Sequence, residues 1–472
     1  MKHLVLPSLL VLVTALAGCA GVDPSPLPET RPVDAYKEAS GPWIAASEDA
    51  EPLRPTAWWK RFEDPDLDRL QDQLLADSPD LAAALARYQQ ARAATDAVRS
   101  AQYPTLGLGA SATRNRQSDR RPLRGASSPD IYNNGLIGLN LDYEIDLWGR
   151  VSQQVKAGAA REHAAKADLA GAQLSLQTQL ADTLLSLRGA DREIALLTNT
   201  EQAYSKAATM IAERHRAGLS SGLDLARAEN QRDSARSQLQ QMQGQRALLE
   251  HAIAAQVGVP ASQFSLAPRI MPELVPAVPL GLPSTLLERR PDIVSAQQRV
   301  AAANASVGVA RTAFFPAITL GALLGYQSDV FSNVIAAPNM FWTIGPALAV
   351  NLLDGGRRQA EVARAKASLD EAGQTYRSVV LQAFTQVEDQ LALLNSFGQA
   401  ASSEQSAVAA ATRALELANN RYKDGAASYL DVVTAQTAAL QAERNALSLT
   451  TRQRRATVQL VRALGGGWSD DS

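Results

Sequence analysis

The chain has 472 residues, 46% of them hydrophobic but only 5% aromatic, with a formal net charge of −2. A near-neutral chain offers no basic surface, so we expect no nucleic-acid partner. The alanine-rich apolar share favours long, closely packed helices over a thick globular core.

Residue types that carry chemistry are sparse. The four histidines are one in the N-terminal leader and three that we interpret as solvated helix residues: His3, His163, His215 and His251. They are too scattered for a metal site or a catalytic triad. No Gly-rich phosphate loop is present, so energy for any transport has to come from a partner. The expectation is no enzyme, no metal and no cofactor.

The N-terminus is typical of an export signal. Lys2 and His3 precede an apolar run, Leu4 to Ala17, that is too short to span a bilayer. The following "LAGC" resembles a bacterial lipobox, which implies cleavage after residue 18 and lipidation, for example by palmitate, of Cys19, the single cysteine. The alternative is an ordinary signal peptide. The residue after the cysteine is Ala20 and not aspartate. By the sorting rule known for lipoproteins of enteric bacteria, this favours localisation to the outer membrane. We expect a signal peptide over 1–18 and a lipidated, extended segment over 19–77.

The remainder is an internal duplication. "SPDLAAALARYQQ" recurs as "RPDIVSAQQRVAA", with Pro79 and Pro291 212 residues apart, and "RHRAGLSSGLD" recurs as "RYKDGAASYLD" at an offset of 207. Several landmarks in register exclude a chance match. The expected regions are a first repeat over 78–258 (strand pair 105–147, helical hairpin 150–257), a Pro-rich linker over 259–283, a second repeat over 284–465 (strand pair 317–353, hairpin 356–464) and a tail over 466–472.

The strand-like runs alternate apolar and polar residues. In "LIGLNLDYEIDLWGR", leucines such as Leu139 share one face, and Asp142, Glu144 and Asp146 share the other. Each run is about 10 residues, the length of a bilayer-crossing strand. Aromatic residues near the run ends suit a membrane girdle: Tyr132, Trp148, Phe331, Phe341 and Trp342. Pro346 indicates an edge or a bulge. The alternative is two hairpins packed on helices of a soluble domain.

The helical runs are exceptionally long. Residues 150–217 and 357–424 each give 68 positions without proline, roughly 100 Å of helix. A coiled-coil-like leucine stripe, including Leu180 and Leu187, needs a partner. The return helices over 223–257 and 430–464 cover about half of each long helix, and the helices over 79–101 and 292–313 are expected to cover the rest.

Taken together, the lipobox, the duplicated halves, "RRPDI" and the twin Gly turns resemble the TolC-like outer-membrane factors of bacterial tripartite efflux systems, specifically the NodT-type lipoprotein branch. The resemblance implies a mainly α fold with a membrane β-barrel: a homotrimer with twelve barrel strands and a twelve-helix tunnel reaching into the periplasm. It also implies a periplasmic adaptor, an inner-membrane pump of the resistance-nodulation-division (RND) type, and contact with outer-membrane lipid.

The same resemblance assigns roles at the hairpin tips. Gly218 and Gly425 are expected to turn the hairpins and contact the adaptor, and Asp224, Tyr422 and Asp431 are expected to form the periplasmic gate. The chain departs from the family pattern at Ala427 and Thr434, so the lock differs in detail. The alternative for both aspartates is a helix-start acid that interacts with the helix dipole.

The expected function is a passive exit duct for small molecules such as drugs or toxic compounds. Two alternatives stay open: a conduit for type I protein secretion and a non-conducting, envelope-spanning tether. The inward-facing acids Asp142, Glu144 and Asp146 predict cation preference. The sequence contains no pocket that identifies a cargo.

Overall fold

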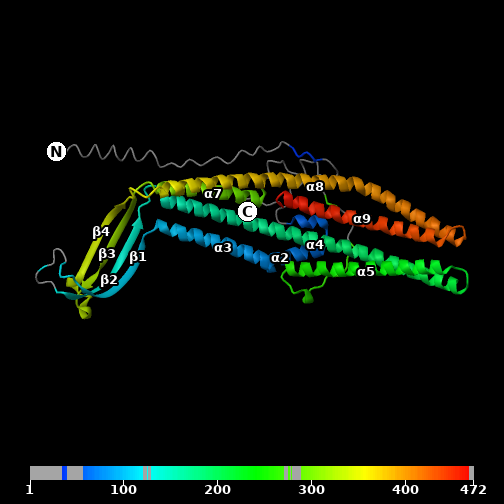
Figure 1. Cartoon of the computed structure of the whole chain (residues 1–472), viewed down its shortest axis with the longest axis horizontal. Coiled ribbons are helices and arrows are strands. Elements are labelled where there is room, and N and C mark those ends of the chain that lie inside the picture. Colours follow the sequence, from blue (N-terminus) through cyan, green and yellow to red (C-terminus); the bar gives the residue numbers. More distant parts are fainter. Residues whose placement is uncertain are drawn as a thin grey trace. The chain divides into compact units, whose positions relative to one another are not determined.

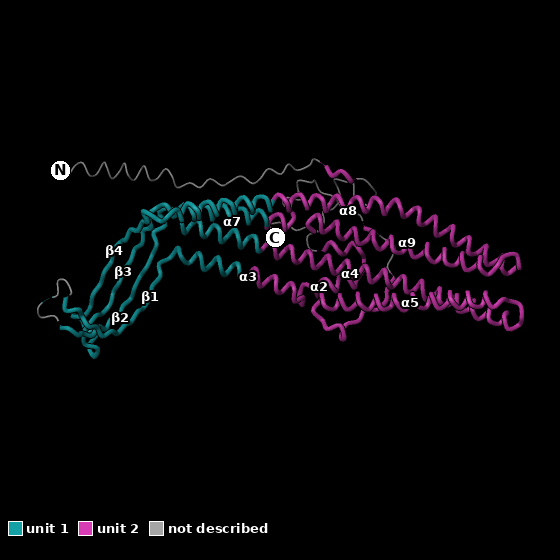
Figure 2. The backbone as a smooth tube through the Cα atoms, in the orientation of Figure 1, with its two compact units in different colours: residues 1–28, 89–165, 296–376 teal, residues 29–88, 166–295, 377–472 magenta. Residues whose placement is uncertain are grey.

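A computed structural model describes residues 35–39, 57–120, 125, 129–270, 275–276, 278 and 289–466. The expected signal peptide, Cys19, much of the linker and most of the C-terminal tail lie outside the described residues. Figure 1 shows the element order. The chain divides into two compact units (Figure 2), residues 1–28, 89–165 and 296–376, and residues 29–88, 166–295 and 377–472.

The first unit contains one four-stranded antiparallel sheet with the order β1-β2-β3-β4. The strands are β1 (Thr105–Arg116), β2 (Ile131–Glu144), β3 (Ala317–Ser328) and β4 (Met340–Ala349). The two expected strand pairs therefore join through β2 and β3, one from each repeat. Pro346 lies on β4, an edge strand of this sheet, as its missing N–H predicts.

The strand register confirms the expected separation of faces. Leu106, Leu141, Ala322 and Ile344 are neighbours across all four strands, while Thr105, Asp142, Gly321 and Gly345 form a row on the opposite face. Two details differ from the expectation. β2 ends at Glu144, so Asp146 lies beyond the strand. Phe341 and Trp342 were both expected in the aromatic girdle. Successive strand residues point to opposite faces, so Trp342 lies on the apolar face and Phe341, which pairs with Gly325, lies on the polar face.

The long helices match the sequence prediction closely. α4 (Arg150–Arg216) and α8 (Arg357–Lys423) have 67 residues each. They turn back into α5 (Gly222–Gln256) and α9 (Tyr429–Ala463), each of 35 residues. Within the described residues, no helix is both long enough and apolar enough to cross a membrane.

Shorter helices cover part of α4, as expected. α3 (Pro79–Arg99) contacts α4 where the Thr95 hydroxyl donates to the Gly158 carbonyl at 3.0 Å. α7 (Pro291–Thr312) contacts α4 through a 3.2 Å hydrogen bond from Arg161 to Ser306.

The core of the second unit is formed by the predicted stripe. Leu180, Leu184 and Leu187 of α4 are fully buried, and their counterparts Val387 and Leu391 of α8 are buried in the same cluster. Burial of this apolar surface supplies the main driving force for pairing the helices.

Residues 58–77 are not extended, contrary to the expectation for 19–77. They form η1 (Trp58–Phe62) and α2 (Pro65–Asp77). Asp64 caps α2 by accepting from the Asp66 N–H, and a proline occupies the first turn. Apolar side chains at helical spacing, Leu67, Leu70 and Leu74, are then fully buried. An Asp-Pro start of this kind is readable in the sequence, but the Pro-rich composition before residue 57 favoured the extended interpretation.

Candidate gate at the hairpin tips

Both hairpins turn at the predicted glycines. Gly218 and Gly425 have φ of +77° and +74°, which an L side chain rarely adopts. At the first tip the Leu219 N–H donates to the Arg214 carbonyl at 2.8 Å and the Gly218 N–H donates to His215 at 2.9 Å. This pair of bonds closes a helix as a Schellman motif. The second tip repeats it with Ala426 to Arg421 at 2.8 Å and Gly425 to Tyr422 at 3.1 Å.

The two predicted gate aspartates lie at matching capping positions. Ser221 is the N-cap of α5, and its hydroxyl accepts from the Asp224 N–H at 3.1 Å. Ser428 is the N-cap of α9, and the Asp431 carboxylate accepts from the Ser428 backbone N–H at 2.9 Å, completing a capping box. The side-chain and backbone hydrogen bonds from Ser428 hold the pKa of Asp431 below its ordinary value of 3.8. Each aspartate therefore stabilises a helix start.

Tyr422 joins the two hairpins. Its ring lies 5.5 Å from that of Tyr429 at an interplanar angle of 58°, and the Arg214 guanidinium lies 5.4 Å above the Tyr422 ring. This is a cation–π contact between the first repeat and the second. Tyr429 is only 4% exposed and packs with Ile211 and Val432. Burial is the main cause that raises the pKa of Tyr429 above its ordinary value.

Polar contacts continue this connection along the helices. Gln231 of α5 donates to Thr437 of α9 at 3.1 Å. Arg444 of α9 donates to Glu193 of α4 at 2.7 Å and to Gln238 of α5 at 3.2 Å. Both hairpins are thus held side by side by aromatic, charged and amide contacts, and separating them requires all three kinds to break.

The three acids predicted to face inward have different surroundings. Asp142 lies on the polar face of β2 and accepts from Asn140 at 3.2 Å. Glu144 pairs with Arg150, with one bond of 2.6 Å from Nε and a second, shorter contact. Asp146 accepts from the Val151 and Ser152 N–H groups at 2.9 and 2.7 Å, so it caps the start of α4. Of the three, Glu144 forms an ion pair and Asp146 caps a helix, whereas the Asp142 carboxylate does neither.

Sequence reasoning missed several residues of the tip. Ser221 and Ser428 had a readable signal, since serine followed three residues later by an acid indicates a capping box. Arg214 and Tyr429 had none, because their contacts depend on how the two hairpins pack. Among the described residues, no group of three His, Cys, Asp or Glu side chains is placed to hold a metal ion.

A buried ion cluster also went unpredicted. Arg188 is fully buried and donates to Asp64 at 3.0 Å, to Asp66 at 2.5 Å and to Asp191 at 3.4 Å. Asp191 also accepts from Arg246 at 2.7 Å. Desolvation opposes the charge on Arg188, but its hydrogen bonds to the Asp64 and Asp66 carboxylates leave its pKa raised overall. The cluster ties α2 to the first hairpin.

An antiparallel sheet built from both repeats, with each repeat continuing into a long helical hairpin, defines the class of outer-membrane channel proteins. The chain matches the family model described as outer membrane efflux protein over residues 70–259 and 282–466, and these two segments coincide with the two repeats. The chain belongs to this family.

Named relatives agree over nearly the whole chain. The pyoverdine export outer membrane protein OpmQ of Pseudomonas aeruginosa is 32% identical over 98% of this chain and 97% of its own. The probable outer membrane lipoprotein SilC of Salmonella typhimurium is 26% identical over 96% of both chains. The solved structure of the outer-membrane channel OprN is 30% identical and superimposes with a TM-score of 0.84, covering 94% of this chain and 99% of that one.

These findings give the function at the level of the family. The chain is an outer-membrane efflux channel, and its family is one of channels rather than enzymes.

Proposed function

We propose that this chain is the exit duct of a tripartite pump, in which a homotrimer exports small molecules passively and an inner-membrane RND pump supplies the energy through a periplasmic adaptor. Four strands leave β1 and β4 as unpaired edges, and open edges are not tolerated in hydrocarbon. Three copies pairing β4 to β1 give twelve strands, more than the roughly eight that a closed barrel needs. The open sheet therefore calls for pairing with further copies of the chain, and the resemblance to trimeric channels favours three.

The hairpin tips form the closed entrance of this duct. The observation that supports the gate most directly is the contact of Tyr422 with Arg214 and Tyr429, which joins the two hairpins of one chain. Opening requires the hairpins to separate, and an adaptor seated at Gly218 and Gly425 would favour the separated state by binding it more tightly. Asp224 and Asp431 narrow the entrance while they also cap α5 and α9.

Single-channel conductance of the full-length protein in planar bilayers tests the gate. If the Asp431 charge acts in the bore, Asp431→Asn raises the conductance, whereas the matched control Ser428→Ala, which removes the cap but keeps the carboxylate, leaves it near the wild-type level. Equal conductance changes in both variants would show that Asp431 acts only as a helix cap. A wild-type protein that never conducts would instead support the structural tether.

A lipid anchor at Cys19 completes the proposal. The sequence around the single cysteine supports it, and SilC, a relative of similar length, is named as a probable lipoprotein. Intact mass spectrometry of the membrane-extracted protein is expected to show an acylated N-terminal cysteine in the wild type and none in Cys19→Ser. An unmodified wild-type chain beginning elsewhere would favour the ordinary signal peptide.

Ion selectivity follows from the acids at the sheet. With Glu144 paired to Arg150 and Asp146 capping α4, Asp142 is the carboxylate that contributes most to a cation preference. Reversal potentials across a salt gradient should show cation preference that weakens in Asp142→Asn. Anion preference in the wild type would contradict this assignment.

A further inference from the structure

We infer that the far end of the sheet carries a groove for a phosphorylated, acylated lipid of the outer membrane. The far end is the one at Arg116, Ile131 and Ser328, opposite the strand ends that join α3 and α4. The inference rests on the proposed function, because it requires the apolar face of the sheet to contact lipid.

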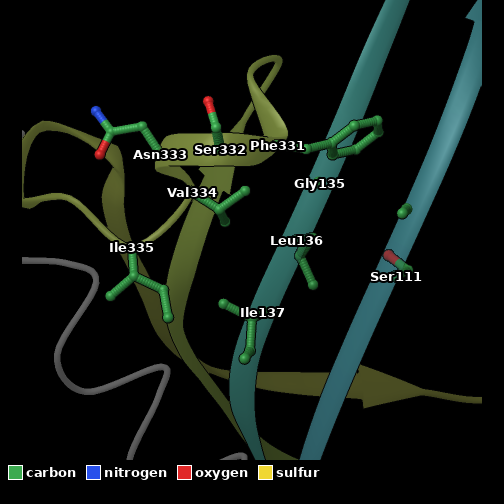
Figure 3. A pocket seen from close by; sticks show the side chains of 10 residues that line it. Ser111, Gly135, Leu136, Ile137, Phe331, Ser332, Asn333, Val334 and Ile335 are labelled. Atoms are coloured by element: carbon green, nitrogen blue, oxygen red, sulfur yellow. The ribbon is translucent and has the colours of Figure 1, made fainter.

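The floor of the groove is a glycine. A Cβ at Gly135 would lie 3.0 Å from a ring carbon of Phe331 and 3.1 Å from a methyl group of Val334. The β3–β4 connection, residues 329–339, therefore folds back over β2 on the apolar face, as Figure 3 shows. It leaves a hollow of about 390 Å³ lined by residues that include Ala112, Ile137 and Ile335.

The connection holds its apolar side chains outward by its own hydrogen bonds. The Asn339 amide donates to the Asn333 carbonyl at 2.7 Å and to the Val334 carbonyl at 3.2 Å. Phe331 is nonetheless 50% exposed and Ile335 is 69% exposed. An exposed apolar cluster held in a fixed shape is typical of a binding surface. Since it continues the apolar face of the sheet, acyl chains are the occupant of matching chemistry.

Two arginines supply the charge complementarity. Arg114 and Arg116 have the same parity on β1 as Ala112, so they lie on the apolar face, roughly 7 and 13 Å further along the strand. Both are exposed, and neither forms an ion pair within the described part of the chain. Arginine binds phosphate with two parallel hydrogen bonds. The apolar groove and the two arginines beyond it, nearer the end of the sheet, fit an anionic lipid. The acyl chains would lie in the groove and the phosphate would lie at the arginines.

Native mass spectrometry of the full-length protein in detergent, titrated with lipid A, tests the inference. Charge-assisted hydrogen bonds of this kind are worth about a tenfold change in affinity each. We expect Arg114→Gln with Arg116→Gln to weaken binding by at least about tenfold, and the matched control Arg413→Gln on α8 to change nothing. Dephosphorylated lipid A should bind the wild type as weakly as lipid A binds the double variant. Inorganic phosphate should not compete.

A second measurement reports the acyl chain. Gly135→Val fills the groove and should reduce lipid binding, whereas Gly109→Val, where a Cβ would meet nothing within 4 Å, should not. A fluorophore on Ile335→Cys in vesicles should be quenched by brominated acyl chains and not by aqueous iodide.

Three results would overturn the inference: lipid A affinity unchanged in the arginine double variant, quenching by iodide alone, or a label shielded from both quenchers by a neighbouring subunit. Conductance of the same preparations separates this failure from failure of the proposed duct. A conducting wild type without lipid binding rejects only the groove.

Discussion

The base of each hairpin is the end away from its Gly turn, where α5 or α9 ends. The two bases occupy matching places in the duplicated repeats, but they are stabilised by different kinds of contact. At the base of the first hairpin the contacts are made by charged side chains: Arg188, Asp191, Arg246 and Glu250. At an offset of 207 residues the second hairpin has neutral side chains: Asn395, Gly398, Gln453 and Thr457. The repeats thus keep the backbone plan and replace the polar contacts.

The charged side chains at the first base also hydrogen-bond the backbone of the segment that follows α5. Arg246 donates to the Leu266 carbonyl at 2.6 Å, and Glu250 accepts from the Leu266 N–H at 2.8 Å. Arg269 donates its N–H to Asp191 at 3.0 Å. Every buried charge named here has a partner, so removal of one charged side chain leaves the others buried without a counter-charge.

The second base is closed by a short strap, residues 35–39. Glu388 accepts from the backbone N–H groups of Lys37 and Glu38 at 2.8 and 3.0 Å, and Asn395 donates to the Glu38 carbonyl at 2.9 Å. Tyr36 is 7% exposed within the core cluster. The strap is held by individual hydrogen bonds and one buried ring. Its release therefore leaves no network of buried charges unpaired.

The largest expected effect comes from the ionic base. Arg188→Met removes the cation from a site where Asp64 is 1% exposed and should lower the free energy of unfolding by about 3–5 kcal/mol. Asn395→Ala, at the matching place, should cost about 1 kcal/mol, because it removes neutral hydrogen bonding such as the bond to the Glu38 carbonyl and leaves no buried charge unpaired. Urea titration followed by tryptophan fluorescence measures both. Equal losses would remove the distinction between the two bases.

An intermediate effect on stability is expected at high pH, where Tyr36 of the strap loses its proton. Burial raises the pKa of Tyr36 to about 12 from its ordinary value of 10.0, and the Glu388 charge adds to the shift. The folded form therefore keeps its proton where the unfolded form loses it. The resulting stability, roughly 2 kcal/mol, is fully present below pH 10 and is lost as the pH rises through about 12.

Tyr36→Phe sharpens this test. The Tyr36 hydroxyl has no hydrogen-bond partner among the described residues, so its removal should leave stability near neutral pH unchanged or slightly higher. Limited proteolysis of residues 35–39 between pH 9 and 12 should show release of the strap in the wild type and a flattened pH profile in the variant. An unchanged profile would exclude Tyr36 as the titrating group.

The smallest effect is expected at the tips, where both repeats use the same chemistry. Because the pKa of Asp431 is depressed in the folded protein, its capping contribution is present above pH 3.8 and is lost as the pH falls through the folded value. Hydrogen exchange of the first turn of α9 should therefore accelerate on acidification. Ser428→Ala should weaken that pH dependence, because only the backbone N–H then donates to Asp431, and should accelerate exchange at neutral pH.

The sequence allows those parts of the fold to be predicted that repeat a local pattern. Period-two runs indicated the strands, the leucine stripe indicated α4 and α8, and Gly218 and Gly425 marked the turns. Tertiary contacts left no such pattern: Arg188 looks like any helix arginine until α2 packs against it. Beside the capping serines, two further misses were readable, namely the start of α2 at Asp64-Pro65 and the opposite faces of Phe341 and Trp342.

Tyr422 offers the most direct test that the paired tips keep this channel shut. Tyr422→Phe keeps the ring that contacts Arg214 and Tyr429, whereas Tyr422→Ala removes it. In planar bilayers at neutral pH, we expect the alanine variant to conduct several-fold more than the wild type and the phenylalanine variant to stay close to it. Wild-type conductance in both variants would contradict a gate closed by these side chains.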